Sequence, residues 1–385
     1  MELQFKKFGA IFILIFFFEI IIFTIQFYFP ILFVELGFDP FEIGFLISIG
    51  FLVNLLLSAP VGILCDRTDL RFLAFSSILI FLVFFFGMTY ATEIFVLTIL
   101  IFIFRLGQLL SRTSLDNIVL KSQPENKNKL IGNYFLFMYF GTVAGIIGAG
   151  YFLSHITFQS MFFYTAIILA VIAPLSYFLP KIKPDETKLS DYAHDVKSVA
   201  VFFIGLAMFF YSFHFGAENI SYTLFLKENL GLDLWSMGLY MGFSILIMAF
   251  AALFFSRKIN SKNVFFFYAV SFLLSGVGHI FMAVDNLYLS FLFRIIHEVG
   301  DAIYLVAFFI FLKDYFPQKR VGGSLGVFAV ITTIGSILGC FLFSYIGFGY
   351  GHDYSLILSG ILTLISALII FIRLNKFSEE LEIKN

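Results

Sequence analysis

Continuous apolar runs of about twenty residues recur along the whole chain and constrain its fold more than any other feature. A run of this length crosses the hydrocarbon layer of a bilayer as one α-helix, because a helix satisfies its backbone hydrogen bonds internally. The strands of a membrane β-barrel would instead alternate polar and apolar residues over about ten positions. The pattern therefore predicts an all-α polytopic membrane protein.

Twelve such runs are present, and each boundary is accurate to a few residues. Hydrophobic residues make up 61% of the 385 residues and charged residues only 13%, more apolar surface than one soluble core could hide. This balance excludes an ordinary soluble enzyme, a disordered protein and a nucleic-acid binder. The runs cover residues 8–29, 41–64, 72–90, 94–110, 130–153, 161–179, 199–226, 236–255, 264–284, 288–312, 324–346 and 354–372.

The basic residues are segregated to one side of these twelve runs. Of the 24 lysines and arginines, Lys227 alone falls in a loop on the opposite side, and only Arg105 and Arg294 lie within runs. This count places Arg112 in the loop after the fourth run. Because cytoplasmic loops are rich in Lys and Arg, we expect a multi-pass protein of the cell membrane with both termini in the cytoplasm.

The two halves of the chain repeat each other at an offset of about 190 residues. The longest polar break predicts a six-helix bundle over residues 1–180, a cytoplasmic central loop over 181–198 and a second six-helix bundle over 199–385. Parallel halves of this kind occur in transporters whose substrate site lies between them. The matching landmarks are Leu36-Gly37-Phe38-Asp39 with Leu230-Gly231-Leu232-Asp233, Phe104-Arg105 with Phe293-Arg294, and Lys129-Leu130-Ile131-Gly132 with Lys319-Arg320-Val321-Gly322.

Ionisable side chains within the runs concentrate in the first, fourth, seventh and tenth. Each costs about 2.5–3.5 kcal/mol in mid-membrane, so we expect them to face a shared cavity or a partner. The set in the tenth run follows the spacing i, i+3, i+4 and i+7, which is one stripe of a helix face. The alternative is an internal ion-pair network that only holds helices together. The predicted substrate cavity comprises Gln26, Gln108, His214, Glu218, Asn219, Arg294 and Asp301.

The segment after the second run, Gly62-Ile63-Leu64-Cys65-Asp66-Arg67-Thr68-Asp69-Leu70-Arg71, resembles a signature of the major facilitator superfamily. That signature reads Gly-x-Leu-x-Asp-Arg-x-x-x-Arg, and Asp69 stands where many members have Gly. The resemblance implies two pseudo-symmetric six-helix bundles that transport by alternating access. It also implies a gating loop that contains Gly62, Asp66, Arg67 and Arg71.

The fourth run contains Arg105 and Gln108, and this pair resembles the Arg-x-x-Gln signature of proton-coupled drug antiporters in the same superfamily. There the arginine is implicated in proton transfer. We expect Glu19 to carry the proton with Arg105 as its charge partner, and His297 with Glu298 to form a second relay. In the fifth run, Gly141, Gly145, Gly148 and Gly150 predict close helix packing.

The favoured function is secondary active transport of small organic solutes, with proton-coupled efflux of drugs or metabolites ahead of uptake of sugars or organic acids. A receptor or scaffold with a transporter fold is the alternative from another class. No Gly-x-x-x-x-Gly-Lys-Ser/Thr loop is present, so the chain does not hydrolyse ATP alone. No hydrolase or metalloprotease motif is present, so we expect no enzyme, cofactor or metal. The expected partners are a solute, protons or another cation, and lipid, around a monomer.

Overall fold

The twelve apolar runs fold as helices that are long enough to cross a bilayer. The computed structural model describes residues 2–122, 124, 126–182, 184, 191, 192 and 197–384, with the backbone alone for residues 2–7, 40 and 374–384. Among these described residues, twelve helical spans meet the length and hydropathy of a membrane helix, from Phe8–Glu35 to His352–Arg373. The prediction of twelve spans is confirmed. The central stretch 181–198 falls largely outside the described residues.

The first half contributes six spans. The first span is built from two helices, α1 and α2, and the sixth ends in the 3-10 helix η1. In chain order the elements are α1 (Glu2–Gln26), α2 (Phe29–Glu35), α3 (Pro40–Arg67), α4 (Leu70–Met88), α5 (Ile94–Lys121), α6 (Lys127–Leu153), α7 (Phe158–Ile172) and η1 (Ala173–Phe178).

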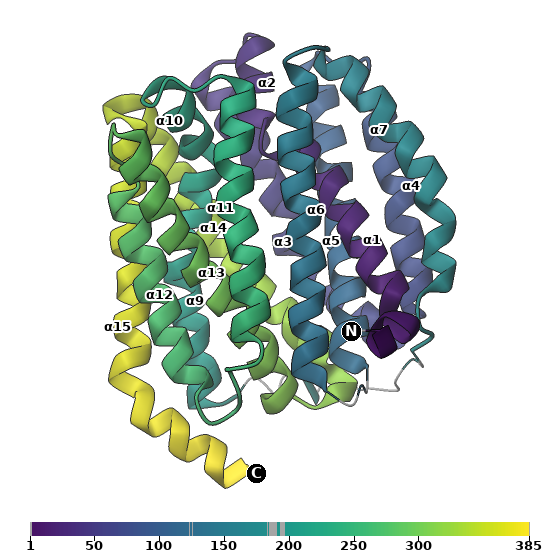
Figure 1. Cartoon of the computed structure of the whole chain (residues 1–385), viewed down its shortest axis with the longest axis vertical. Helices are drawn as coiled ribbons and strands as arrows, with labels where there is room; N and C mark the ends of the chain where they lie inside the picture. The colour runs from purple at the N-terminus through teal and green to yellow at the C-terminus, as the bar shows by residue number, and fades with distance from the viewer. Residues whose placement is uncertain are drawn as a thin grey trace.

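The second half follows the same plan, and its first span is again composite. The α-helix α9 passes into a π-helical turn, η2, before α10. In chain order the elements are α9 (Val199–Ala217), η2 (Glu218–Tyr222), α10 (Thr223–Glu228), α11 (Leu234–Phe255), α12 (Val264–Phe281), α13 (Leu287–Tyr315), η3 (Gln318–Arg320), α14 (Val321–Tyr350) and α15 (His352–Lys384). Figure 1 shows the two halves side by side, with the C-terminal end of α15 extending below the bundle.

The internal repeat is visible in the backbone where α3 and α11 begin. Gly37 and Gly231 both have positive φ, 84° and 65°, a conformation that glycine adopts without strain. Two residues later an aspartate caps the helix: Asp39 accepts from the Glu42 N–H at 2.9 Å, and Asp233 accepts from the Ser236 N–H at 2.7 Å. The matching sequence landmarks therefore encode the same turn in each half.

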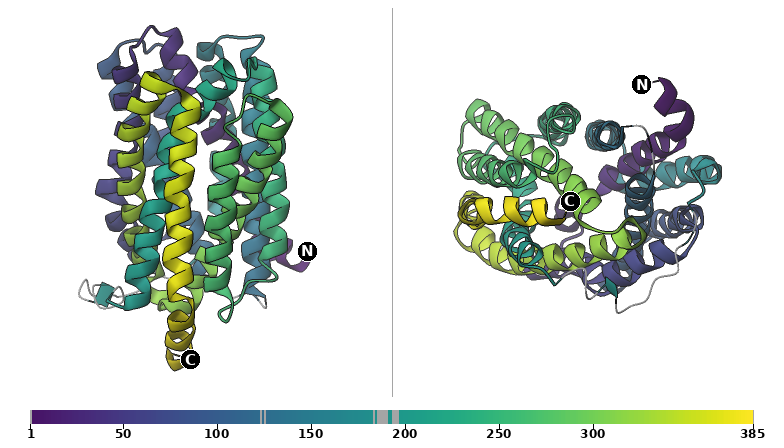
Figure 2. Two further views of the ribbon diagram at one scale, coloured as in Figure 1. Left: turned by 90° about the vertical axis from the view of Figure 1, so that its left-hand side faces the viewer. Right: turned by 90° about the horizontal axis from the view of Figure 1, so that it is seen from below.

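Two helix pairs join the halves: α3 packs along α14, and α6 packs along α11. The view from below in Figure 2 shows the helices of both halves arranged around one centre. At one end, Gly62 of α3 meets Gly322 of α14 so closely that a Cβ on either glycine would overlap the other's backbone. At the other end, a Cβ on Gly150 would lie 2.7 Å from the carbonyl oxygen of Leu234. The halves therefore touch at both ends.

Large apolar side chains also cover the outer surface of the bundle. Phe41, Phe72 and Phe371 are among many exposed aromatic and aliphatic residues on the spans. In water such a surface would drive aggregation, whereas in a bilayer it meets hydrocarbon of the same polarity. The outer surface therefore requires lipid as its solvent.

Three of the four glycines in α6 make the close packing that their spacing predicts. A Cβ on Gly141 would overlap the Phe16 carbonyl of α1, one on Gly145 would lie 2.7 Å from the Ile20 oxygen, and Gly150 faces α11. For Gly148 the prediction is wrong, because nothing lies within 4 Å of a Cβ there. Gly148 points away from the α1 and α11 contacts that its neighbours make.

These four positions give a matched test of helix packing. Gly145→Ala should destabilise the bundle by about 1–3 kcal/mol, because the added methyl group forces α1 away from α6. Gly148→Ala should be neutral or slightly stabilising, because alanine favours the helix and meets open space. Thermal unfolding of both purified variants in detergent measures the difference. Equal melting temperatures would contradict the packing assigned to α1 and α6.

Candidate functional site

A cavity of about 490 Å³ lies between the two halves and is lined by side chains from both. Its volume is typical of a site for a small organic molecule. The wall combines aromatic and aliphatic residues with a small set of charged and amide groups. Those polar groups are Glu19, Gln26, Asn54, Arg105, Arg112, Asp116, Glu218, Asn219, Arg294, Glu298 and Asp301.

Glu19 is paired with Arg112, and the sequence prediction that Arg105 would be its partner is wrong. The Glu19 carboxylate is 1% exposed and lies 3.0 Å from the Arg112 guanidinium. The Thr142 hydroxyl of α6 donates to its other oxygen at 3.2 Å. The α1 carboxylate is therefore fixed by α5 and α6 together, which satisfies a charge that lies far from bulk water.

Arg112 and Asp116 enter the site because α5 continues to Lys121, eleven residues beyond the predicted end of the fourth run. The sequence analysis assigned Arg112 to a loop and missed Asp116. The Tyr134 hydroxyl donates to Asp116 at 2.7 Å. Arg112 follows Arg105 at i+7 on the same helix face, and this continuation of the stripe is the signal that could have extended the span.

Arg105 lies among amides instead of carboxylates. Its guanidinium donates to Gln108 at 2.8 Å and to Gln26 at 3.3 Å, while its Nε makes no hydrogen bond. The lack of a side chain at Gly50 makes room for it, since a Cβ there would lie 2.6 Å from Nε. No ion pair is found for Arg105 within the described part of the chain. Gln108, predicted to line the cavity, lies behind Arg105 and orients it.

Arg294 is the counterpart of Arg105 in the second half, and it is held by acids. Its guanidinium pairs with Glu218 and lies 2.7 Å from Glu298, one turn along α13. It also stacks on the Tyr222 ring, with 4.5 Å between the guanidinium carbon and the ring centroid. The two carboxylates neutralise the buried guanidinium, so this pair of helices is joined by charge.

Glu218 reaches Arg294 because the seventh span changes its winding there. The π-helical turn η2 begins at Glu218 and ends at Tyr222. A π-turn inserts one extra residue into the helix and rotates the side chains that follow it. Asn219, also predicted from the sequence, lines the cavity on this turn, and its side-chain amide donates to the Phe215 carbonyl at 2.6 Å.

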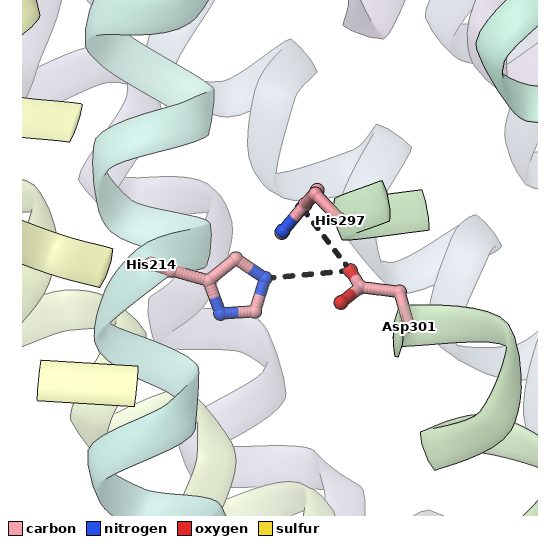
Figure 3. Close-up of side chains that lie close together, drawn as sticks. All are labelled: His214, His297 and Asp301. Carbon is pink, nitrogen blue, oxygen red and sulfur yellow. Dashed lines mark ion pairs between the residues drawn. The ribbon is translucent and has the colours of Figure 1, made fainter. Parts of the chain in front are cut away.

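His214 and His297 lie beside Asp301 in the interior of the second half (Figure 3). The Nε2 atom of each histidine is 3.5 Å from the same Asp301 oxygen. His297 Nε2 is also 3.2 Å from Glu218. Both rings are fully buried and neither lines the cavity, so His214 lies behind the wall that it was predicted to form. Asp301 and Glu218 connect this group to the cavity.

The predicted gating loop joins the two halves at the end of the bundle that carries the chain termini. The buried Asp66 carboxylate lies 2.9 Å from Lys121 Nζ in α5. It also accepts from the backbone N–H groups of Gly322 and Gly323 at 3.2 and 2.9 Å, at the start of α14. An acidic group at a helix N-terminus satisfies N–H groups that have no partner within the helix.

Only part of the signature crosses between halves. Asp69 pairs with Arg71 at 2.7 Å in its own loop, and the Arg71 guanidinium hydrogen-bonded to it holds the pKa of Asp69 below its usual value. Arg67 is exposed. Gly62 has the structural role of admitting the α14 backbone. The residue that connects the halves by charge is therefore Asp66.

The sequence model of the Major Facilitator Superfamily matches residues 11–284 and 263–384, which together span nearly the whole chain. No curated protein matches this sequence. Three solved structures share its fold at 12–14% identity. The human organic anion transporter MFSD10 (TETRAN) aligns with a TM-score of 0.75, covering 94% of this chain and 99% of its own.

The other two structures align over similar lengths. A bacterial homologue of the human lysosomal transporter Spinster, in an inward-facing and unoccupied conformation, has a TM-score of 0.71 and 12% identity, with 96% of each chain covered. A POT family transporter in complex with a thioalcohol-conjugated peptide has a TM-score of 0.77 and 14% identity, again with 96% of each chain covered. At this level of identity the likeness concerns the fold alone.

A double-mutant cycle tests the pairing of Glu19. Glu19→Gln and Arg112→Gln should couple by about 0.5–3 kcal/mol in the free energy of unfolding, as residues in direct contact do. The matched cycle with Arg105→Gln should show almost no coupling, because Arg105 contacts Gln26 and Gln108 instead. Both cycles are read from thermal unfolding in detergent. Strong coupling of Glu19 to Arg105 would restore the pairing expected from the sequence.

Proposed function

Because the chain belongs to the major facilitator superfamily and is a membrane transporter, not an enzyme, we propose that it moves small organic solutes by alternating access coupled to protons. The central cavity would then be the solute site, and the two halves would rock about it. We also propose that the protein resides in the cell membrane with both termini in the cytoplasm, on the evidence of the lysine and arginine distribution.

The observation that carries the solute assignment is the state of Arg105. A buried guanidinium on a cavity wall usually has a carboxylate partner, as Arg294 has in Glu218 and Glu298. Arg105 has only two glutamines and an Nε without a partner. A guanidinium offers donors in a planar fork that fits carboxylate and phosphate groups. The proposed solute therefore carries an anionic group that binds Arg105.

The aromatic part of the wall suits the rest of such a solute. Phe51 lies against Arg105, with 5.5 Å from the guanidinium carbon to the ring centroid, and Phe135, Phe215 and Phe308 also line the cavity. The solute is thus an amphipathic organic anion of modest size. Export, which the resemblance to drug antiporters favours, is the proposed direction.

The proposed proton carrier is Glu19. Its carboxylate lines the cavity and is held by only one guanidinium, Arg112, whose side chain is 31% exposed. A solute or water that draws Arg112 away would leave a buried carboxylate without a charge partner, and taking up a proton would remove the cost of that charge. Substrate position and proton occupancy would therefore be linked.

Transport by the purified full-length chain tests this function. Proteoliposomes with an imposed pH gradient are offered pairs of amphipathic carboxylates and their neutral amides. Carboxylates should be moved against their concentration gradient and the amides should not. Transport of the amides alone would refute the anion assignment, and binding of solutes without any transport would indicate a receptor instead.

In the same assay, Glu19→Gln should abolish gradient-driven accumulation while equilibrium binding of the carboxylate persists, because glutamine cannot exchange a proton. Glu35→Gln replaces an exposed acid at the end of the same span and should leave accumulation unchanged. Concentrative transport by Glu19→Gln at the wild-type rate would exclude Glu19 as the carrier.

Asp66 is proposed to hold the cytoplasmic end closed. Asp66→Asn weakens the pair with Lys121 and the contacts with Gly322 and Gly323, so the cavity should open more often toward that end. A cysteine at cavity residue Asn54, in a chain with Cys65 and Cys340 replaced by serine, should then react several-fold faster with an impermeant maleimide in inside-out vesicles.

Asp69→Asn is the control for that experiment, because Asp69 pairs with Arg71 within one half. It should leave the labelling rate at the level of the parent. An unchanged rate in Asp66→Asn, with the cysteine still reactive after detergent solubilisation, would show that Asp66 does not control the opening.

A further inference from the structure

Three histidines converge in the interior of the second half, from three separate helices. His214 lies on α9, His279 on α12 and His297 on α13, and all three rings are fully buried. The ring centroids of His279 and His297 are 4.8 Å apart, and those of His214 and His297 are 5.3 Å apart. Two carboxylates, Glu218 and Asp301, border the group.

The hydrogen bonds of two of these rings determine which nitrogen faces the carboxylates. His297 Nδ1 lies 3.0 Å from the Ser275 carbonyl oxygen, and His214 Nδ1 contacts the Tyr211 carbonyl. A carbonyl only accepts, so Nδ1 carries the proton in each ring. In the neutral ring Nε2 then presents a lone pair, and each Nε2 points at a carboxylate oxygen 3.2–3.5 Å away. Two acceptors at such a distance require a cation between them.

His279 adds an independent observation. Neither of its ring nitrogens makes a hydrogen bond within the described residues, although the side chain is fully buried. A buried polar group without a partner is costly and calls for an explanation. Its ligand atom lies within 4.8 Å of one on Glu218 and one on His297, and the same limit holds among His214, His297 and Asp301.

The charge of the cluster points the same way. Glu218, Glu298 and Asp301 carry three negative charges, whereas Arg294 supplies one positive charge. With neutral imidazoles the group has a net charge of two units, negative, inside the membrane-spanning region. One divalent cation balances that charge.

From these observations we propose that His214, His279, His297, Glu218 and Asp301 form a binding site for one divalent transition-metal ion of the zinc type. Ligands about 2.0–2.2 Å from a tetrahedral ion lie roughly 3.3–3.6 Å from one another, which is close to the separations of His214, His297 and Glu218 from their neighbours. Imidazole and carboxylate donors select zinc, cobalt, nickel or copper over magnesium and calcium.

The proposed site also has the outer contacts and the entry path that metal sites need. The carbonyls of Ser275 and Tyr211 orient His297 and His214 through Nδ1, as second-layer groups do for ligating histidines. Glu218 and Asp301 line the central cavity, so an ion reaches the histidines from there. The spacing of His297 and Glu298 on one helix did not predict a metal, because the other histidines come from α9 and α12.

Binding of Co²⁺ and Zn²⁺ to the purified full-length chain, freed of any histidine tag, tests the site. Co²⁺ should give the visible absorption bands of a tetrahedral complex at one ion per chain, and Zn²⁺ should displace it. Mg²⁺ and Ca²⁺ at the same concentration should not. The readout is binding by purified protein, so it stands apart from the transport function.

Variants locate the ion. His297→Gln and the nearly isosteric Asp301→Asn should each weaken Zn²⁺ binding in calorimetry by at least about tenfold. His155→Gln removes an exposed histidine of the first half and should have no effect. Thermal unfolding shows which variants are folded, and Asp301→Asn keeps the side-chain volume. Absence of cobalt bands in the wild type, or equal binding in folded Asp301→Asn and His155→Gln, would overturn the proposal.

Discussion

A charge inside a hydrocarbon layer needs a partner, and the interior of this protein follows from that requirement. The partners come mostly from other helices, so each pair also fixes how two helices lie against each other. Glu19 joins α1 to α5 through Arg112, and Arg294 joins α13 to η2 through Glu218. Because the apolar surfaces of the helices face lipid and protein equally well, these polar contacts supply much of the specificity of packing. The cavity forms where they converge.

The two halves share a backbone plan but differ in chemistry, and this asymmetry bears on function. Corresponding arginines, Arg105 and Arg294, line the same cavity from opposite halves. The first is surrounded by amides and the second by carboxylates. An arginine without an acid retains affinity for an external anion, whereas one that is neutralised acts mainly as a structural link. The first half is therefore the proposed solute-binding side, and the second half holds the histidine cluster.

Close helix approach and charge act together at the end of the bundle that carries the termini. Gly62 brings α3 against the start of α14, and this contact places Asp66 within reach of the free N–H groups of that helix. Lys121 at the end of α5 completes the contact. A link of this kind is strong when the helices touch and vanishes when they separate, because hydrogen bonds act over short distances. It can therefore distinguish two arrangements of the halves.

Twelve spans, the internal duplication and the polar stripes followed from the sequence, because hydrophobic length and the cost of buried charge can be read along one dimension. The partner of Glu19 could not be read in this way. Helix α5 continues past Leu110, and the choice between Arg105 and Arg112 depends on the depth and rotation of two helices, which differ by two turns. The convergence of His279 with the other histidines likewise depends on how three helices pack. Neighbours from separate helices are decided only when the chain has folded.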